Sequence, residues 1–341
     1  MVKNLFQLLE VSIKKIFLSS LLSLLALLSL VVSPGQAQSQ RFPVAYSAIS
    51  ATQTGLYITK EAGLFEKHGL NVDLIYIGSG TRVAQAVIAG EFPIALAGGT
   101  IVNANLAGGN ITIVGGIVNV PAFYLIVHPS IKKPEDLKGK ALGITRYGSS
   151  TDFTLRYLIK KWGMDPDRDV KILQMGGQPE ILAGVQAGVI QGGNFSSPSD
   201  YKARKAGYFV LADLGKIGLD YPTVSIVSTR SYIKKDSATV KRFLMAYSEG
   251  VQKLFKDKDY AMKVIGKYTR TQDHEVLEAS YTYAINFIER TPRLPYKAIE
   301  TVLAQTAERD PKAKEHKAED FIDATFFNEL EKSGFFKSLV W

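Results

Sequence analysis

The sequence predicts an α/β protein built from two lobes of similar construction. Two stretches repeat one plan of strand, glycine turn, helix, glycine and strand, and they start 98 positions apart at Val72 and Val170. Alternating strands and helices are typical of a parallel sheet covered by helices. Two such units in register indicate two lobes, and two facing lobes create a cleft. The alternative is that any parallel sheet drifts toward this pattern, with the glycines acting only as helix C-caps.

The first 37 residues have the order of a secretory signal peptide. Lysines near the start are followed by an apolar run over 16–32 and by small residues up to Ala37. We therefore expect export to the periplasm and a mature chain that starts at or near Gln38. An uncleaved membrane anchor is the alternative, because an apolar run of this length is close to the shortest that spans a bilayer.

Composition narrows the class of protein. The chain has 341 residues, no cysteine and a formal net charge of +9. Without cysteine there are no disulfides, no thiolate nucleophile, no cysteine-ligated metal and no lipid-modified N-terminal cysteine. The basic residues are dispersed among acidic ones, as at 132–136, which is typical of a solvated surface and disfavours a nucleic-acid partner. A weak attraction for anionic ligands remains.

Strands and helices alternate from residue 42 onward. In order along the chain, we expect strands at 42–47, 72–77, 93–97 and 111–117, and helices at 57–68, 81–89 and 101–106. Glycine or a polar cluster separates each element from the next. This alternation predicts a parallel sheet with helices on both faces.

A second α/β series occupies about 140–211, beginning with a strand at 141–145. Extended runs at 123–127 and 223–228 flank it, and five helical patterns follow at 236–254, 260–268, 273–287, 296–306 and 319–330. We expect a first lobe made of 38–127 and 223–341, a second lobe at 128–222, and two hinge crossings between them. Two consecutive domains with a C-terminal helical bundle are the rival layout.

Enzyme signatures are sparse. The four histidines are not spaced as metal ligands, and no H-E-x-x-H, G-x-S-x-G or Walker motif occurs. The loop at 78–83 begins like a dinucleotide fingerprint but has Val83 where the third glycine belongs. We therefore expect a protein that is not an enzyme and has no metal or cofactor.

Small polar loops follow the predicted strands. In open α/β sheets, ligands bind outside the carboxyl ends of the strands, where hydroxyls and helix N–H groups collect. Each loop alone could instead be a plain helix N-cap that does not contact the ligand. Ser149 and Thr151 are the clearest case, since either role fits them. The predicted ligand-binding residues are Ser47, Ser50, Thr52, Ser79, Gly80, Thr81, Gly99, Thr100, Tyr124, Tyr147, Gly148, Ser149, Ser150, Thr151, Asn194 and Ser196.

Four segments, at 56–70, 133–140, 143–153 and 176–183, carry a resemblance to a known family. They resemble substrate-binding proteins of the nitrate/sulfonate/taurine and thiamine-precursor (NMT1/THI5-like) type, over nearly the whole mature chain. The resemblance implies a type II periplasmic binding protein, with two α/β lobes, a central cleft, two hinge crossings and a ligand trapped between the lobes. It also implies delivery of that ligand to the membrane permease of an ABC transporter.

The resemblance does not name the ligand. The cleft loops lack a clustered arginine pair, since Arg82 and Arg146 lie in or beside different loops, and this disfavours a simple nitrate or bicarbonate site. We expect a monomeric solute-binding protein for a small polar or anionic organic compound of sulfonate, aromatic-acid or pyrimidine type. A periplasmic enzyme acting on a pyrimidine-type metabolite and a ligand-reporting subunit of a membrane sensor are the alternatives.

Overall fold

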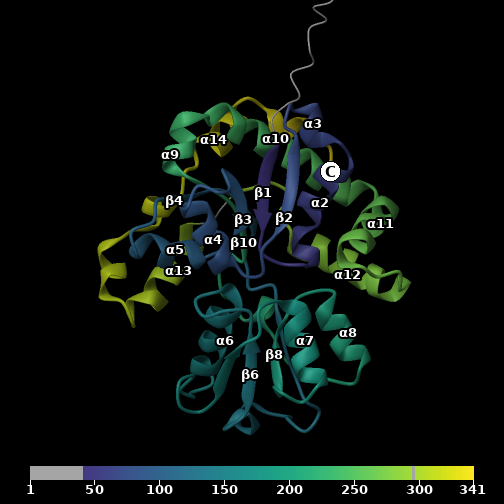
Figure 1. Cartoon of the computed structure of the whole chain (residues 1–341), viewed down its shortest axis with the longest axis vertical. Helices are drawn as coiled ribbons and strands as arrows, with labels where there is room; N and C mark the ends of the chain where they lie inside the picture. Colours follow the sequence, from purple (N-terminus) through teal and green to yellow (C-terminus); the bar gives the residue numbers. More distant parts are fainter. Residues whose placement is uncertain (1–40, 294–295) are drawn as a thin grey trace, which may run out of the picture. The chain divides into compact units, whose positions relative to one another are not determined.

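The computed structural model describes residues 41–293 and 296–341, so the predicted signal peptide lies outside the described residues. Ten strands form two five-stranded sheets (Figure 1). Sheet A has the order β2-β1-β3-β10-β4, and its strands are β1 (Phe42–Tyr46), β2 (Val72–Tyr76), β3 (Ile94–Ala97), β4 (Ile111–Val118) and β10 (Val224–Thr229). Sheet B has the order β7-β6-β8-β5-β9, and its strands are β5 (Tyr124–Val127), β6 (Ala141–Ile144), β7 (Lys171–Gln174), β8 (Gly192–Phe195) and β9 (Phe209–Asp213).

The two sheets follow one plan. The unit β2–α4–β3 in sheet A, with α4 at Gly80–Ile88, corresponds to β7–α7–β8 in sheet B, with α7 at Gln178–Gln186. Both units are those of the sequence repeat, which is therefore confirmed as two lobes of like build. Each sheet also holds one antiparallel strand, β10 in sheet A and β5 in sheet B. Both sheets are therefore mixed, whereas the prediction was a parallel sheet.

The chain passes twice between the sheets, through segments 119–123 and 214–223. These crossing segments lie side by side, because the backbone N–H of Tyr221 donates to the carbonyl of Asn119 at 3.0 Å and that of Thr223 to Val118 at 2.8 Å. The extended runs predicted as the crossings are instead sheet strands. β5 pairs with β8 and β9 inside sheet B, although the prediction placed it in the first lobe, and β10 pairs with β3 and β4 inside sheet A.

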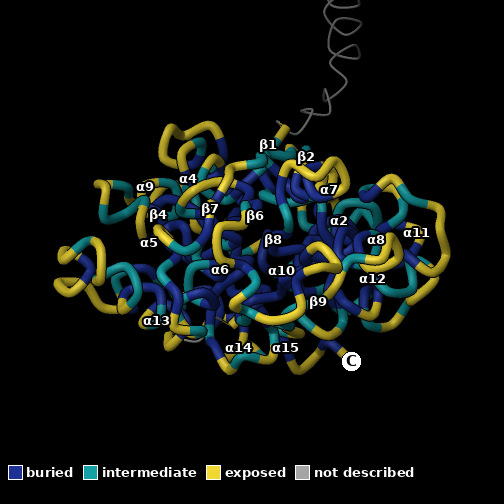
Figure 2. Tube along the Cα trace, turned by 90° about the horizontal axis from the view of Figure 1, so that it is seen from below, coloured by how far each residue is buried: buried dark blue, intermediate teal, exposed yellow. Residues whose placement is uncertain are grey.

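Helices cover both sheets, and the buried segments run through the strands (Figure 2). The helices that follow β10 pack on sheet A in one apolar core with Val44, Leu96 and Phe243, so they belong to the first lobe. The further α-helices are α2 (Thr54–Glu61), α3 (Leu64–Lys67), α5 (Thr100–Leu106), α6 (Ser150–Lys161), α8 (Ser199–Lys205), α9 (Arg230–Lys235), α10 (Ser237–Lys256), α11 (Lys258–Thr269), α12 (His274–Phe287), α13 (Tyr296–Ala307), α14 (Thr325–Lys332) and α15 (Phe335–Ser338). The 3-10 helices are η1 (Ala51–Gln53), η2 (Pro134–Leu137), η3 (Leu214–Lys216), η4 (Pro311–Glu315) and η5 (Ala318–Phe321).

Two helices predicted as continuous are interrupted. The first breaks between α2 and α3 because Gly63 adopts a left-handed conformation with φ 67°. The second, predicted at 319–330, divides into η5 and α14. Here Ile322 forms a β-bridge with Ile113 of β4, and the N–H of Asp323 donates to the Ile113 carbonyl at 2.8 Å. Pairing with a distant strand therefore overrides the local helical preference.

None of the helices in the described part of the chain combines the length and the apolar character that crossing a bilayer requires.

Candidate ligand-binding cleft

A cavity of about 50 Å³, here the central cavity, lies between the two sheets. Its walls are the loops after β1, β2 and β3 of sheet A, the loops after β6, β7 and β8 of sheet B, and both crossing segments. The volume is several times the roughly 10–15 Å³ that one water molecule occupies on the same measure. The lining residues are Ser47, Ala48, Thr52, Gln53, Ser79, Gly80, Gly98, Phe123, Thr145, Ser149, Ser150, Thr151, Gln178, Ser196, Thr223 and Val224.

Half of the predicted ligand-binding residues line this cavity: Ser47, Thr52, Ser79, Gly80, Ser149, Ser150, Thr151 and Ser196. Four more, Gly99, Thr100, Tyr147 and Gly148, line a larger space of about 670 Å³ on one flank of the cleft, here the side opening. Thr81 lies on a neighbouring groove. Its hydroxyl donates to the carbonyl of Tyr147 in the other lobe at 3.3 Å.

Ser50, Tyr124 and Asn194 were also predicted to bind the ligand, and they line neither space. Ser50 caps η1, since its hydroxyl accepts from the N–H of Thr52 at 3.3 Å. Tyr124 lies in β5 with the Arg204 guanidinium 5.6 Å from its ring centroid. Asn194 joins β8 to α6, because its amide nitrogen donates to the Thr151 carbonyl and to a second oxygen on that helix. All three side chains have local structural partners.

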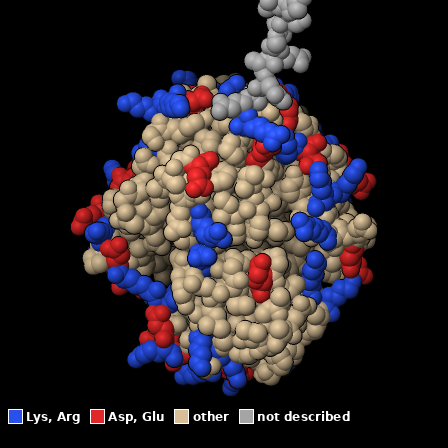
Figure 3. All heavy atoms as spheres, viewed as in Figure 1, with Lys and Arg blue, Asp and Glu red and all other residues tan. Residues whose placement is uncertain are grey.

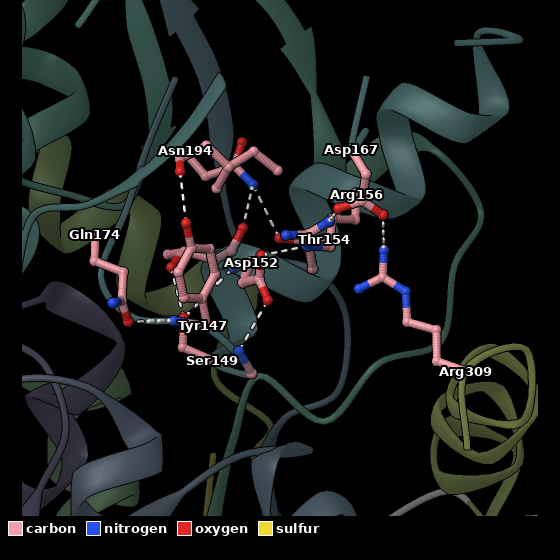
Figure 4. A network of polar contacts seen from close by, with 12 residues as sticks. Tyr147, Ser149, Asp152, Thr154, Arg156, Asp167, Gln174, Asn194 and Arg309 are labelled. Carbon is pink, nitrogen blue, oxygen red and sulfur yellow. Dashed lines mark hydrogen bonds and ion pairs between the residues drawn. The ribbon is translucent and has the colours of Figure 1, made fainter. Parts of the chain in front are cut away.

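The start of α6 is held by its own hydroxyls (Figure 4). Ser149 is the N-cap, with its hydroxyl accepting from the N–H of Asp152, and it lies 2.8 Å from the hydroxyl of Thr151. The Thr151 hydroxyl also accepts from the N–H of Thr145 at 2.9 Å. Ser149 therefore acts as a helix N-cap, as one of the two alternatives predicted, and Ser149 and Thr151 also form part of one wall of the central cavity.

Two cavity-lining glutamines were not among the predicted residues. Gln53 ends η1 and Gln178 begins α7, one on each side of the cavity. The signal in the sequence is a glutamine beside a helix start: Gln53 immediately precedes α2, and Gln178 is followed by Pro179 at the second helical position of α7.

Tyr221 lines the side opening and contacts Ser150, which lines the central cavity. Its ring stacks on Phe153 of α6 with centroids 4.6 Å apart, and its hydroxyl donates to the hydroxyl of Ser150 at 3.2 Å. Burial raises the pKa of the Tyr221 hydroxyl, so the group stays protonated and remains a donor at physiological pH. This tyrosine lies in the second crossing segment and thereby ties it to the second lobe.

Charged side chains at the side opening pair with one another across the cleft (Figure 4). Arg309, just beyond α13 in the first lobe, donates to Asp167 of the second lobe at 2.6 Å. Asp167 also accepts from Arg156 at 2.6 Å, and Arg156 in turn binds Asp152 at 2.6 Å. Although a space of this size is ordinary for a ligand site, its charges are already satisfied. The central cavity, by contrast, has no charged residue among its described lining residues.

On the opposite flank, Lys205 of α8 lies 3.0 Å from Asp273 and 2.8 Å from Glu275 at the start of α12. The hydrogen bonds from Lys205 lower the pKa of both carboxyls. Carboxyls whose pKa is lowered by this contact contribute their full stabilisation at a pH above the ordinary carboxyl pKa. The stabilisation is lost as the pH falls through the lowered pKa, where the carboxyls become protonated. Acid and salt are thus both expected to loosen this tie between the lobes.

We expect Lys205→Gln to weaken ligand binding by a small factor in dilute buffer, because these ion pairs form only when the lobes meet. The difference from the wild type should vanish near 1 M salt, where the Debye length is about 3 Å. Titration calorimetry at the two salt concentrations measures this. Lys202→Gln is the control, since among the described residues Lys202 of the same helix forms no ion pair. Equal affinities of Lys205→Gln and wild type in dilute buffer would contradict the expectation.

No three His, Asp or Glu side chains come together as a metal site within residues 41–293 and 296–341. On the face shown in Figure 3, basic and acidic side chains are interspersed rather than gathered into one patch. The surface on this side therefore gives no support for a nucleic-acid partner.

Comparisons with known proteins identify the family and the fold of this chain. A family model described as NMT1/THI5 like matches residues 50–261. The chain belongs to the NMT1/THI5-like family. The taurine-binding periplasmic protein of Escherichia coli (strain K12) is 27% identical to this NMT1/THI5-like protein over 256 residues, which are 72% of this chain and 76% of the relative.

Two solved structures share the fold of this NMT1/THI5-like protein. The alkanesulfonate-binding protein SsuA from Xanthomonas axonopodis pv. citri, bound to MOPS, matches with a TM-score of 0.68 and 19% identity, covering 82% of this chain and 94% of that one. The periplasmic nitrate-binding protein NrtA from Synechocystis PCC 6803 matches with a TM-score of 0.68 and 12% identity, covering 87% and 89%. The predicted fold of a type II periplasmic binding protein is confirmed. All three relatives are named as binding proteins, which agrees with the prediction of a protein that is not an enzyme.

Proposed function

We propose that this protein captures a small polar organic compound in the periplasm and delivers it to the permease of an ABC transporter. The observation that carries the proposal is the central cavity, because loops at the carboxyl ends of strands from both sheets converge on it together with the two crossing segments. A ligand held there contacts both lobes at once. Its release then requires the lobes to separate.

Closure of two lobes around a ligand is a recurring mechanism of binding proteins, with the connecting segments as the hinge. In this chain the hinge is made of 119–123 and 214–223, and we propose that the second lobe moves about it as a unit. Tyr221, the flanking ion pairs and a backbone hydrogen bond from Ala51 to the Ser197 carbonyl at 2.8 Å hold the lobes together. These contacts are mostly polar, which suits a closure that must be reversible.

The proposal predicts that a cognate compound stabilises the protein against heat. At a concentration a hundred times its dissociation constant, a ligand that binds only the folded state stabilises it by about 2.7 kcal/mol. For a protein of this size that corresponds to a rise in Tm of several degrees. A thermal-shift screen against sulfonates, aromatic acids, pyrimidines, amides and inorganic anions measures it. If no small solute raised the Tm, and the mature chain were not found in the periplasm, the proposal would fail.

A further inference from the structure

Gln53 is buried in the wall of the central cavity with both ends of its side-chain amide unpaired. The residue is 1% exposed, and neither Nε2 nor Oε1 has a hydrogen-bond partner among the described residues. Buried polar groups in native proteins are nearly always paired, and an unpaired one is costly. An amide with both its donor and its acceptor unpaired, next to a cavity, is poised to bind something that enters the cavity.

Gln178 on the opposite wall shows what a structural glutamine looks like at the same site. Its Nε2 donates to the carbonyl of Asn194 at 3.1 Å, and its Oε1 accepts from the N–H of Ser196 at 3.1 Å. Both ends are thus bound by backbone, and the side chain fixes the loop after β8. Gln53 has the same burial and the same cavity beside it, but its amide has no such role.

The hydroxyls around the cavity also include bonded and unpaired groups. In the second lobe, Thr145, Ser149 and Thr151 bind one another. In the first lobe, the Ser79 hydroxyl is buried without a partner among the described residues, and Ser79 adopts φ 86°, a conformation unusual for a residue other than glycine. The buried groups of the cavity wall that lack a partner among the described residues, the Gln53 amide and the Ser79 hydroxyl, therefore come from the first lobe, whereas the three second-lobe hydroxyls are bonded to one another.

The chemistry of the cavity indicates what Gln53 binds. None of the described residues that line it carries a charge, so a fully ionic group at Gln53 would be buried without a counter-charge. A sulfonate or carboxylate offers only acceptors and would leave Oε1 facing other oxygens. A group with an N–H beside a C=O matches both ends of the amide. The starts of α4 and α6 at the cavity favour further acceptor oxygens on the same compound.

We propose that Gln53 determines ligand specificity by binding, through both ends of its amide, an uncharged edge of the ligand in which N–H and C=O lie side by side, as in an amide, a lactam or a ureide. The inference rests on the proposed function and narrows its ligand class.

Titration calorimetry with hydantoin, uracil and nicotinamide, and in parallel with taurine, ethanesulfonate and nitrate, tests the inference. Three proteins are compared: wild type, Gln53→Met, which keeps the length of the side chain, and Gln305→Met, which removes an amide from the side opening. At least one amide-type compound should bind the wild type and Gln305→Met equally. Gln53→Met should lower its affinity tenfold or more. The Tm of ligand-free Gln53→Met should not fall below that of the wild type, because no bonded partner is lost.

Each contrary outcome is distinct. Binding of taurine, ethanesulfonate or nitrate without binding of any amide-type compound would overturn the inference and leave the proposed function standing. Unchanged affinity in Gln53→Met, or a lowered Tm of its ligand-free form, would show that Gln53 is structural and would also overturn it. If none of the six compounds bound, the proposed function would lose its support and the inference would fall with it.

Discussion

Gly98→Val should destabilise the protein by about 3 kcal/mol, the upper part of the usual range for overpacking a buried site. Gly98 follows β3 and lies against the second crossing segment. A Cβ atom there would be 2.4 Å from the carbonyl oxygen of Thr223 and 2.5 Å from that of Pro222. Both are backbone atoms, so neither can rotate away as a side-chain end could. The crossing segment itself would have to move, and urea unfolding followed by circular dichroism measures the loss.

Gly177→Ala is the matched control for this substitution. A Cβ at Gly177 would also make short contacts, at 2.6 Å to Glu180 Oε2 and 2.7 Å to the hydroxyl of Tyr76. Both are side-chain ends rather than backbone atoms: the Glu180 carboxylate can rotate away, and the Tyr76 ring can tilt without moving the backbone. The control should therefore unfold close to the wild type. Wild-type stability of Gly98→Val would show that the crossing segment is not fixed against β3, and the hinge assignment would need revision.

Tyr221→Ala should cost about 3–5 kcal/mol of unfolding free energy, the range for removing a buried aromatic side chain. The ring is 1% exposed and packs in the core of the first lobe as well as on Phe153 of the second. The substitution also enlarges the side opening, which Tyr221 lines, and removes the hydrogen bond to Ser150 in the wall of the central cavity. Ligand affinity should fall with stability, which calorimetry on protein that remains folded would measure.

Tyr221→Phe separates the ring from its hydroxyl. It keeps the stacking on Phe153 and removes only the hydrogen bond to Ser150, which is worth about 1 kcal/mol. A loss in Tyr221→Phe as large as that in Tyr221→Ala would mean that the hydroxyl, and not the packing of the ring, holds the crossing segment to the second lobe. That outcome would contradict the packing role of the Tyr221 ring.

Local sequence patterns predicted most of the strands and helices correctly because these patterns reflect local structure. The spacing of apolar residues follows from the face that an element buries, and the glycines follow from the turns that end it. Where a distant partner decides, the local pattern misleads. Ile322 was predicted as helical and instead bridges to β4, and 123–127 was predicted as a crossing although its partners are β8 and β9.

The candidate site was predictable as a set of loops but not in its details. Strand ends mark where a ligand binds, and most of the predicted residues do lie at the cleft. Which hydroxyls remain free depends on hydrogen bonds within each loop, such as those of Ser149 and Thr151, and a sequence pattern does not show these. The unpaired amide of Gln53 lies in the wall of a cavity that both lobes form, and a sequence pattern does not show such a cavity.

The position of β10 bears on the order in which the protein acquires its structure during synthesis. β4 joins sheet A only through β10, and β3 also has β10 as its neighbour on that side. Until residues 224–229 leave the ribosome, β4 therefore has no template, and the edge of β3 is an exposed row of backbone groups. Sheet B is complete in sequence by residue 213, so the inserted lobe is able to fold first. Nascent chains that stop short of β10 should accordingly combine one finished lobe with one aggregation-prone half, and a chaperone that shields the N-terminal strands would act in that interval.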